Sequence, residues 1–191
     1  WSVPTISNQR TLSTFLGGNA VAGGKLKETG FTYWDSPNTG ATNTSNFNAR
    51  GGGTRLAGTG VFESFKEFSQ YWAQGSNASG GHMSVVKYDL ATYTAYNGSI
   101  TYSFPEKTGS AVRLIKDTTS LSNGQTGTYT GNDGKVYRTI CIGTQEWLAD
   151  NLLETKYRDL SAVPEVTDNT TWAGLTTGAR CSYDNDPNNA L

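Results

Sequence analysis

The stretch MSVVKYDLATYTAYNGSITYSF, residues 83–104, decides the fold class of this chain. Apolar and polar side chains alternate with period two over residues 83–90, 92–96 and 99–104, the spacing typical of strands with one buried face. Asn97-Gly98 separates the last two runs, and a type I′ turn needs positive φ at both of its central positions. We therefore predict a β-hairpin at Asn97-Gly98 within a β-rich chain.

The residues before this stretch predict short helices. Pro4-Thr5 offers an N-cap, an apolar stripe follows, and Gly17-Gly18 ends the pattern, so the first helix should dock on a sheet. A second helical turn over residues 21–28 is expected to be broken by Gly23-Gly24.

Two stretches between these helices and residue 83 are harder to assign. Residues 30–60 are rich in glycine, threonine, asparagine and serine, with Trp34 and Phe47 embedded. A loop of this length is normally either functional or fixed by its own aromatic side chains. Residues 61–72 are aromatic at partly helical spacing, and the pattern does not decide between helix and strand.

A polar segment divides the chain after residue 117. Residues 110–116 predict a strand, whereas residues 118–128, TTSLSNGQTGT, have almost no apolar side chain and predict a linker. The linker separates two unequal parts, residues 1–117 and residues 129–191.

The second part begins with regular structure and ends without it. Residues 135–142 predict another strand, and residues 146–153 form a short apolar segment that is helical or irregular. Residues 159–191 are loop-rich.

The composition is typical of a β-rich, loop-rich extracellular protein. The 191 residues include 23 glycines and 12% aromatic residues but only 16% charged residues. The net charge of −1 argues against nucleic acid or an anionic membrane as a partner, because both need clustered Lys and Arg. No apolar run approaches the length of a membrane span. The chain opens on Trp1 without a leader pattern, so we expect a mature, processed or excised chain located outside the cell or on its surface.

The second part contains motifs that occur together in a known family. They are DGKVY at 133–137, IGTQEWLADNL at 142–152 and YDND at 183–186. They resemble the opening half of the Fibrobacter succinogenes major paralogous domain.

The first part resembles the closing half of the same domain. The matching motifs are WSVPT at 1–5, GGKLKETG at 23–30, Trp34 with SPNTGATN at 36–43, Gly52-Gly53 with Arg55, and SAVR at 110–113. The two halves are therefore in swapped order. The aromatic-rich segment that joins them in the family has no counterpart in this chain.

The resemblance implies an α+β fold that is C-type-lectin-like, β-rich and loop-rich with one or two short helices, as in the sulfatase-modifying-factor group. In that fold the first and last strands of the domain lie side by side. We therefore expect residues 135–142 to pair with residues 110–116.

Three interpretations of the swapped order remain open. The chain is a circular permutant closed through residues 118–128, a piece of a tandem array, or a subunit that completes its domain with a neighbouring chain. Completion between copies is heterologous and does not close on itself, so filaments grow. Closure within one chain has the advantage of a short linker.

We expect a non-enzymatic structural or adhesive subunit that assembles head-to-tail into an extracellular filament by inter-chain domain completion, with copies of itself as partners. Apolar side chains from both parts should form the assembly core, because burial of large side chains gives a durable junction. They are Trp1, Val3, Leu12, Phe15, Leu16, Ile140, Ile142, Trp147 and Leu152.

The alternative function is a monomeric, lectin-like carbohydrate-binding module of the surface. Exposed aromatic rings would form its glycan platform, and the candidates are Tyr33, Trp34, Trp72, Tyr93 and Tyr96. The calcium-sugar motifs of true C-type lectins, Glu-Pro-Asn and Trp-Asn-Asp, are absent from the sequence.

Catalytic chemistry finds little support. His82 is the one histidine, and it follows two glycines as a solvent-facing or structural residue would. The sulfatase-modifying enzymes of this fold group act through cysteines near the C-terminal end of their domain. The corresponding residues 84–116 contain no cysteine. We expect no enzyme and no cofactor. Calcium is the one candidate metal, at Asp184 and Asp186, and a plain Asx-rich turn is the alternative there.

Three further side chains are candidates for covalent chemistry. Cys141 and Cys181 are compatible with one disulfide or with two free thiols. The sequence Asp117-Thr118-Thr119 resembles an O-glycosylation acceptor of bacteria of that phylum, which implies modification of Thr118. A plain polar linker is the alternative.

Overall fold

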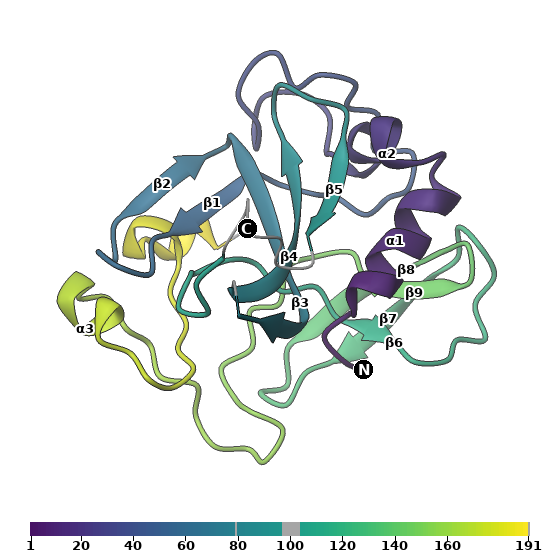
Figure 1. Cartoon of the computed structure of the whole chain (residues 1–191). Coiled ribbons are helices and arrows are strands. Elements are labelled where there is room, and N and C mark those ends of the chain that lie inside the picture. Colours follow the sequence, from purple (N-terminus) through teal and green to yellow (C-terminus); the bar gives the residue numbers. More distant parts are fainter. Residues whose placement is uncertain (79, 97–103, 191) are drawn as a thin grey trace.

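The computed structural model describes residues 1–78, 80–96 and 104–190, and the described part is a β-rich α+β fold with three sheets and few short helices (Figure 1). The predicted fold class is confirmed at this level, with α3 as one short helix more than expected. The helices are α1 (Ile6–Phe15), α2 (Asn19–Leu26) and α3 (Asn169–Ala173), with 3-10 turns η1 (Tyr183–Asn185) and η2 (Pro187–Asn189). The strands are β1 (Gly52–Arg55), β2 (Phe62–Phe65), β3 (Phe68–Asn77), β4 (Gly80–Lys87), β5 (Tyr93–Tyr96), β6 (Ile115–Lys116), β7 (Thr126–Thr130), β8 (Val136–Ile142) and β9 (Gln145–Leu148).

Helix α1 forms where the sequence predicts it. The Thr5 side chain accepts a hydrogen bond from the Asn8 amide and the Asn8 side chain bonds back to Thr5, a capping box. The buried face includes Ile6 and Leu12 and packs beside β4 and β5. Phe15 is a correction, because it is 53% exposed and lies on the rim over Gly143 rather than in the core.

Helix α2 continues through Gly23-Gly24 and is not broken there, contrary to the expectation. The reason is a close approach of other backbone segments. A Cβ atom on Gly23 would collide with the carbonyl of Thr92, and one on Gly24 with the carbonyl of Gly40. Because neither glycine has a side chain, the helix can lie directly against Thr92, which immediately precedes β5, and against the long loop.

The central sheet has the order β3-β4-β5 and is antiparallel throughout. The ambiguous residues 61–72 form β2 and the start of β3, with a turn at Lys66, where φ is 62°. Strands β1 and β2 form a separate hairpin. The Asn97-Gly98 turn and the strand predicted after it, up to residue 103, lie outside the described residues.

The third sheet has the order β6-β9-β8-β7. The expected pairing of residues 110–116 with residues 135–142 is wrong, because β9 lies between β6 and β8 and pairs with both. The segment predicted to be helical or irregular therefore begins as a central strand. Its sequence, QEWL, is too short to show a period.

The polar segment at 118–128 is fastened to this sheet rather than loose. Its last residues enter β7, the Thr119 hydroxyl donates to Glu146 at 2.6 Å, and the Gly143 amide donates to Asn123 at 2.8 Å. The amide of Cys141 also donates to the Gln125 carbonyl. Hydrogen bonds to β8, β9 and the turn between them therefore fasten this segment in place of apolar packing.

One core joins the two parts of the chain. Leu12, Leu16 and Phe47 of the first part pack in one cluster with Ile140 and Trp147 of the second. Figure 1 accordingly shows α1 (purple) beside β8 and β9 (green). The long loop is fixed by its aromatic side chains, since Trp34 and Phe47 are both buried. No helix in the described ranges is long and apolar enough to cross a membrane.

Candidate functional site

Arg113 lies at the centre of the junction between the two parts. It is 1% exposed, and its guanidinium donates to the carbonyls of Phe47 at 2.6 Å and Leu148 at 3.0 Å. It also donates to the Asn151 side chain at 2.6 Å and to the Asn48 carbonyl at 2.9 Å. Burial lowers the pKa of Arg113. Its hydrogen-bond acceptors are neutral and come from both parts, so this side chain ties residues 47–48 to residues 148–151.

Aromatic rings surround this arginine. The guanidinium lies 4.6 Å from the Phe47 ring centre, and Phe47 makes edge contacts with Tyr71 at 5.6 Å and Trp147 at 6.0 Å. Such edge contacts add to the free energy of burial. The junction is therefore packed like a domain core.

Most of the predicted assembly core lies at this junction. Leu12, Leu16, Ile140, Ile142 and Trp147 are buried in the main cluster. Trp1, Val3 and Leu152 are half-buried and pack against a second cluster on the other face of the same sheet. Phe15 alone is exposed, as described above.

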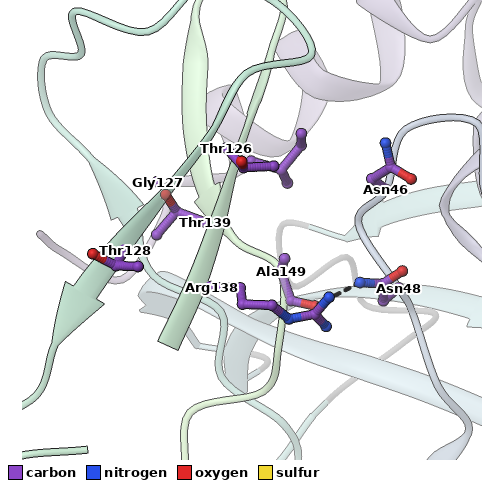
Figure 2. A pocket seen from close by; sticks show the side chains of 9 residues that line it. Asn46, Asn48, Thr126, Gly127, Thr128, Arg138, Thr139 and Ala149 are labelled. Carbon is purple, nitrogen blue, oxygen red and sulfur yellow. Dashed lines mark hydrogen bonds between the residues drawn. The ribbon is translucent and has the colours of Figure 1, made fainter. Parts of the chain in front are cut away.

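A cleft of about 470 Å³ opens beside the junction (Figure 2). Asn46 and Asn48 form one wall and the strands β7 and β8 the other, and the lining residues are Asn46, Asn48, Thr126, Gly127, Thr128, Arg138, Thr139, Ile140 and Ala149. The Asn48 side chain donates to the Ala149 carbonyl at 3.4 Å, and the Ala149 amide donates to the Arg138 carbonyl of β8 at 2.8 Å, so these two bonds link the walls.

The chemistry of this cleft is polar and weakly charged. Arg138 forms a two-bond ion pair with Asp150, at 2.7 and 3.0 Å, and this pairing raises the pKa of Arg138. The remaining lining offers hydroxyl and amide groups over the Ile140 and Ala149 side chains. Such a surface can hydrogen-bond a small polar ligand. The sequence contains no signal for it, because its walls come from distant segments.

Lys27 is a second buried cation that sequence reasoning missed. It is fully buried, and its Nζ donates to the carbonyls of Lys87 at 2.9 Å, Tyr88 at 3.3 Å and Leu90 at 2.9 Å. Burial lowers the pKa of Lys27 to about 8, and Asp89 opposes this shift in part. The lysine holds the turn after β4 against α2.

We expect the free energy of unfolding to rise with pH through the titration of Lys27. The folded chain releases this proton at about pH 8 and the unfolded chain near 10.5, so the unfolded chain binds more protons between these values. The gain from pH 7 to 9.5 should be about 2 kcal/mol relative to Lys27→Met, measured by urea unfolding of both proteins. An unchanged difference between the two proteins at both pH values would contradict the assignment.

The five residues predicted to form the glycan platform do not lie together in the structure. Trp34 and Tyr93 are wrong as platform residues, because they are 0% and 1% exposed and are bonded internally, Trp34 to the Ala49 carbonyl and Tyr93 to Ser84. Tyr33 lies elsewhere, stacked on Arg50 at 4.2 Å. Trp72 and Tyr96 are half-buried, and both pair with Met83, so the three share one row on the outer face of the central sheet, the face away from the main cluster. Met83, between the two rings, is itself 0% exposed.

Aromatic and polar groups continue along this outer face. A hollow of about 130 Å³ is lined by Phe68, Gln70, Val85, Lys87, Tyr96 and Phe104. Lys87 lies 5.0 Å from the Phe68 ring centre. The face thus combines flat rings with hydrogen-bonding side chains.

The remaining predicted sites have local roles. Cys141 and Cys181 are free thiols, so the disulfide is not formed. Cys141 contacts the Leu121 and Gly143 carbonyls, and burial raises the pKa of both thiols. Thr118 is exposed.

The acidic turn behaves as the Asx-rich alternative expects. The Asp186 carboxylate accepts two bonds from Asn188, each 2.9 Å, and Asp184 has a left-handed φ of 52°. Within the described ranges, no group of three or more His, Cys, Asp or Glu side chains is placed to hold a metal ion. Calcium at Asp184 and Asp186 stays a prediction.

Comparison of the chain with protein-family models, with curated proteins and with solved structures found no match in any of the three.

Proposed function

We propose that the chain is a non-enzymatic structural or adhesive subunit, secreted or held at the cell surface, that assembles head-to-tail into an extracellular filament. The observation that carries this proposal is the junction. One core and one sheet are built from residues 1–117 and 129–191, and the only covalent connection between these parts is the polar segment between β6 and β7.

The same contacts can form within one chain or between neighbours, because the parts meet through packing rather than through a continuous element. When the second part of one copy completes the first part of the next, the interface is heterologous and leaves a free half at each end. The fully buried Arg113 and Trp147 would then lie inside every subunit boundary. A boundary of this kind has the strength of a domain core.

Further features belong to the same proposal. The fold is C-type-lectin-like with swapped halves, which agrees with the β-rich α+β architecture. Thr118 is the O-glycosylation site, since it is exposed while its neighbour Thr119 is bonded to Glu146. A modified, hydrophilic surface suits an extracellular fibre.

Negative-stain electron microscopy of the purified chain tests the proposal, and long regular fibres are the expected result. Trp1→Ala should shorten the fibres, because Trp1 of the first part packs on Tyr129 of the second, with ring centres 5.1 Å apart. Trp72→Ala is the matched control and should leave fibres intact. Compact single particles from the unaltered chain would refute assembly and leave the self-closed permutant.

A second candidate function, glycan binding by a monomer, is favoured by the outer face of the central sheet. Trp72 and Tyr96 lie on one row there, two strand spacings apart, which is about 10 Å. Rings spaced in this way can stack on separate sugar units.

Affinity electrophoresis in gels containing xylan, mannan or hydroxyethyl cellulose separates this candidate from assembly. Glycan binding predicts that one polysaccharide retards the unaltered chain and that Trp72→Ala abolishes the retardation. Phe31→Ala, the loss of an exposed ring away from this face, should migrate like the unaltered chain. Equal mobility of all three proteins in every gel would exclude the platform.

A further inference from the structure

Residues 164–189 form a peripheral segment that lies beside the β1-β2 hairpin (Figure 1, yellow). The segment contains α3, η1 and η2 and no named strand. Of its residues, all of which the structure describes, Trp172 alone is buried. The segment is therefore held from outside by the body of the molecule and has no core of its own.

Arg55 of β1 provides the main polar anchor. Its guanidinium donates to the carbonyls of Val166 at 2.6 Å and Thr167 at 2.8 Å, and to the Asn169 side chain at 3.0 Å. The fourth bond, to the Gly60 carbonyl at 2.8 Å, holds the arginine on its own hairpin. Since Arg55 is 1% exposed, these bonds are shielded from water.

Two aromatic side chains of the segment provide the apolar anchors. Trp172 lies 4.3 Å from the Arg55 guanidinium and donates from Nε1 to the Lys107 carbonyl at 3.0 Å. Tyr183 stacks on Phe65 at 4.6 Å and contacts Phe62 at 5.2 Å.

The body is shaped to receive these rings. Gly53 has a positive φ of 64°, and a Cβ there would collide with the Tyr183 ring. A Cβ on Gly109 would approach the Trp172 ring to 2.9 Å. Arginine and aromatic anchors in fitted pockets are typical of the energetic centre of a protein–protein interface.

The tether to this segment is exposed and closed by few bonds. Residues 156–162 are all exposed. The loop is closed by backbone bonds from Val163 to Thr155 at 2.8 Å and from Tyr157 to Ser161 at 2.9 Å. Before it, the Glu154 carboxylate accepts from the amides of Asn132 and Asp133 and fixes the chain to the β7-β8 turn. The Asn132 side chain also donates to the Tyr157 carbonyl at 3.1 Å, so the tether itself is bonded to this turn.

We propose that, when the second part of one copy completes the first part of the next, its residues 164–189 supply the anchoring contacts, and that this segment of one chain docks on Arg55, Phe62 and Phe65 of the next. This inference rests on the proposed head-to-tail assembly and names the surfaces that carry it. Because donor and receptor are different surfaces of one chain, each docked copy offers a new free receptor, and growth continues.

Two complementary variants test the exchange. The donor-defective chain carries Trp172→Ala and Tyr183→Ala, and the receptor-defective chain carries Arg55→Met and Phe65→Ala. Each pair of changes should weaken docking at least about thirty-fold, because each removes interface anchors. Neither variant alone should form fibres. Should Arg55→Met prevent folding, Phe62→Ala with Phe65→Ala replaces it and keeps the arginine.

The mass of an equimolar mixture of the two variants decides whether the segment docks between chains. Only one donor–receptor pair remains intact in it, so we expect a species of twice the 20.5 kDa chain mass and no longer polymer, measured by light scattering. A mixture that stays at the single-chain mass overturns the exchange.

The controls separate the exchange from the assembly itself. Phe31→Ala should form fibres like the unaltered chain. Fibres from both defective variants would overturn the exchange and leave head-to-tail assembly standing. An unaltered chain that gives single particles only would overturn the assembly, whereas a doubled mass in the mixture would still show that the segment docks between chains.

Discussion

Replacing Arg113 by methionine is expected to lower the free energy of unfolding by about 3–5 kcal/mol, because buried acceptors lose their donor. The four acceptors come from residues 47–48 of the first part and residues 148–151 of the second. Methionine fills part of the space but donates no hydrogen bond. The loss should appear in urea unfolding followed by tryptophan fluorescence.

Arg138→Met is the matched control for this change. Arg138 also makes two charge-assisted bonds, but its side chain is 62% exposed. Exposed ion pairs contribute at most about 1 kcal/mol. Equal effects of the two substitutions would show that Arg113 does not hold the junction together.

Trp147→Ala should cost about 3–5 kcal/mol, since it empties the centre of the main cluster. Trp147 is 1% exposed and touches Phe47, while its backbone pairs with Ile115 and Ile140. A loss of this size should lower the melting temperature and remove fibres together, because core and junction are the same contacts.

A comparison of Trp147→Phe with Trp34→Phe tests the packing of the two buried tryptophans more specifically. Within the described residues the buried Nε1 of Trp147 has no hydrogen-bond partner, whereas the Trp34 Nε1 donates to the Ala49 carbonyl at 2.8 Å. Trp147→Phe removes an unsatisfied group and should cost less than Trp34→Phe by about 1 kcal/mol. The reverse order, measured by calorimetry, would contradict the packing described.

The local signals of the sequence predicted the elements that depend on neighbouring residues. The cap at Thr5 predicted α1, the period of two predicted β4 and β5, and the strand predicted at residues 135–142 is β8. The prediction that Gly23-Gly24 would break α2 was wrong because these glycines serve a tertiary contact. Thr92 and Gly40 approach the helix closely there, and no local sequence pattern contains this information.

Whether a predicted site residue is buried or exposed decides the role it can have, and the sequence does not contain that information. Trp34 and Trp72 are both aromatic residues in polar surroundings, yet one is buried in the core and the other is partly open. Lys27, Arg55 and Arg113 were missed because their partners are mainly backbone carbonyls, which carry no sequence signature. The motifs GGKLKETG, Gly52-Gly53 with Arg55, and SAVR contain all three of these cations but do not explain them.

The measurement that tests head-to-tail assembly most directly is the mass of the unaltered chain in solution, by light scattering over a range of concentrations. Assembly predicts a mass that rises with concentration in multiples of 20.5 kDa. A single species of 20.5 kDa at every concentration would contradict it and show that the two parts close on each other within one chain.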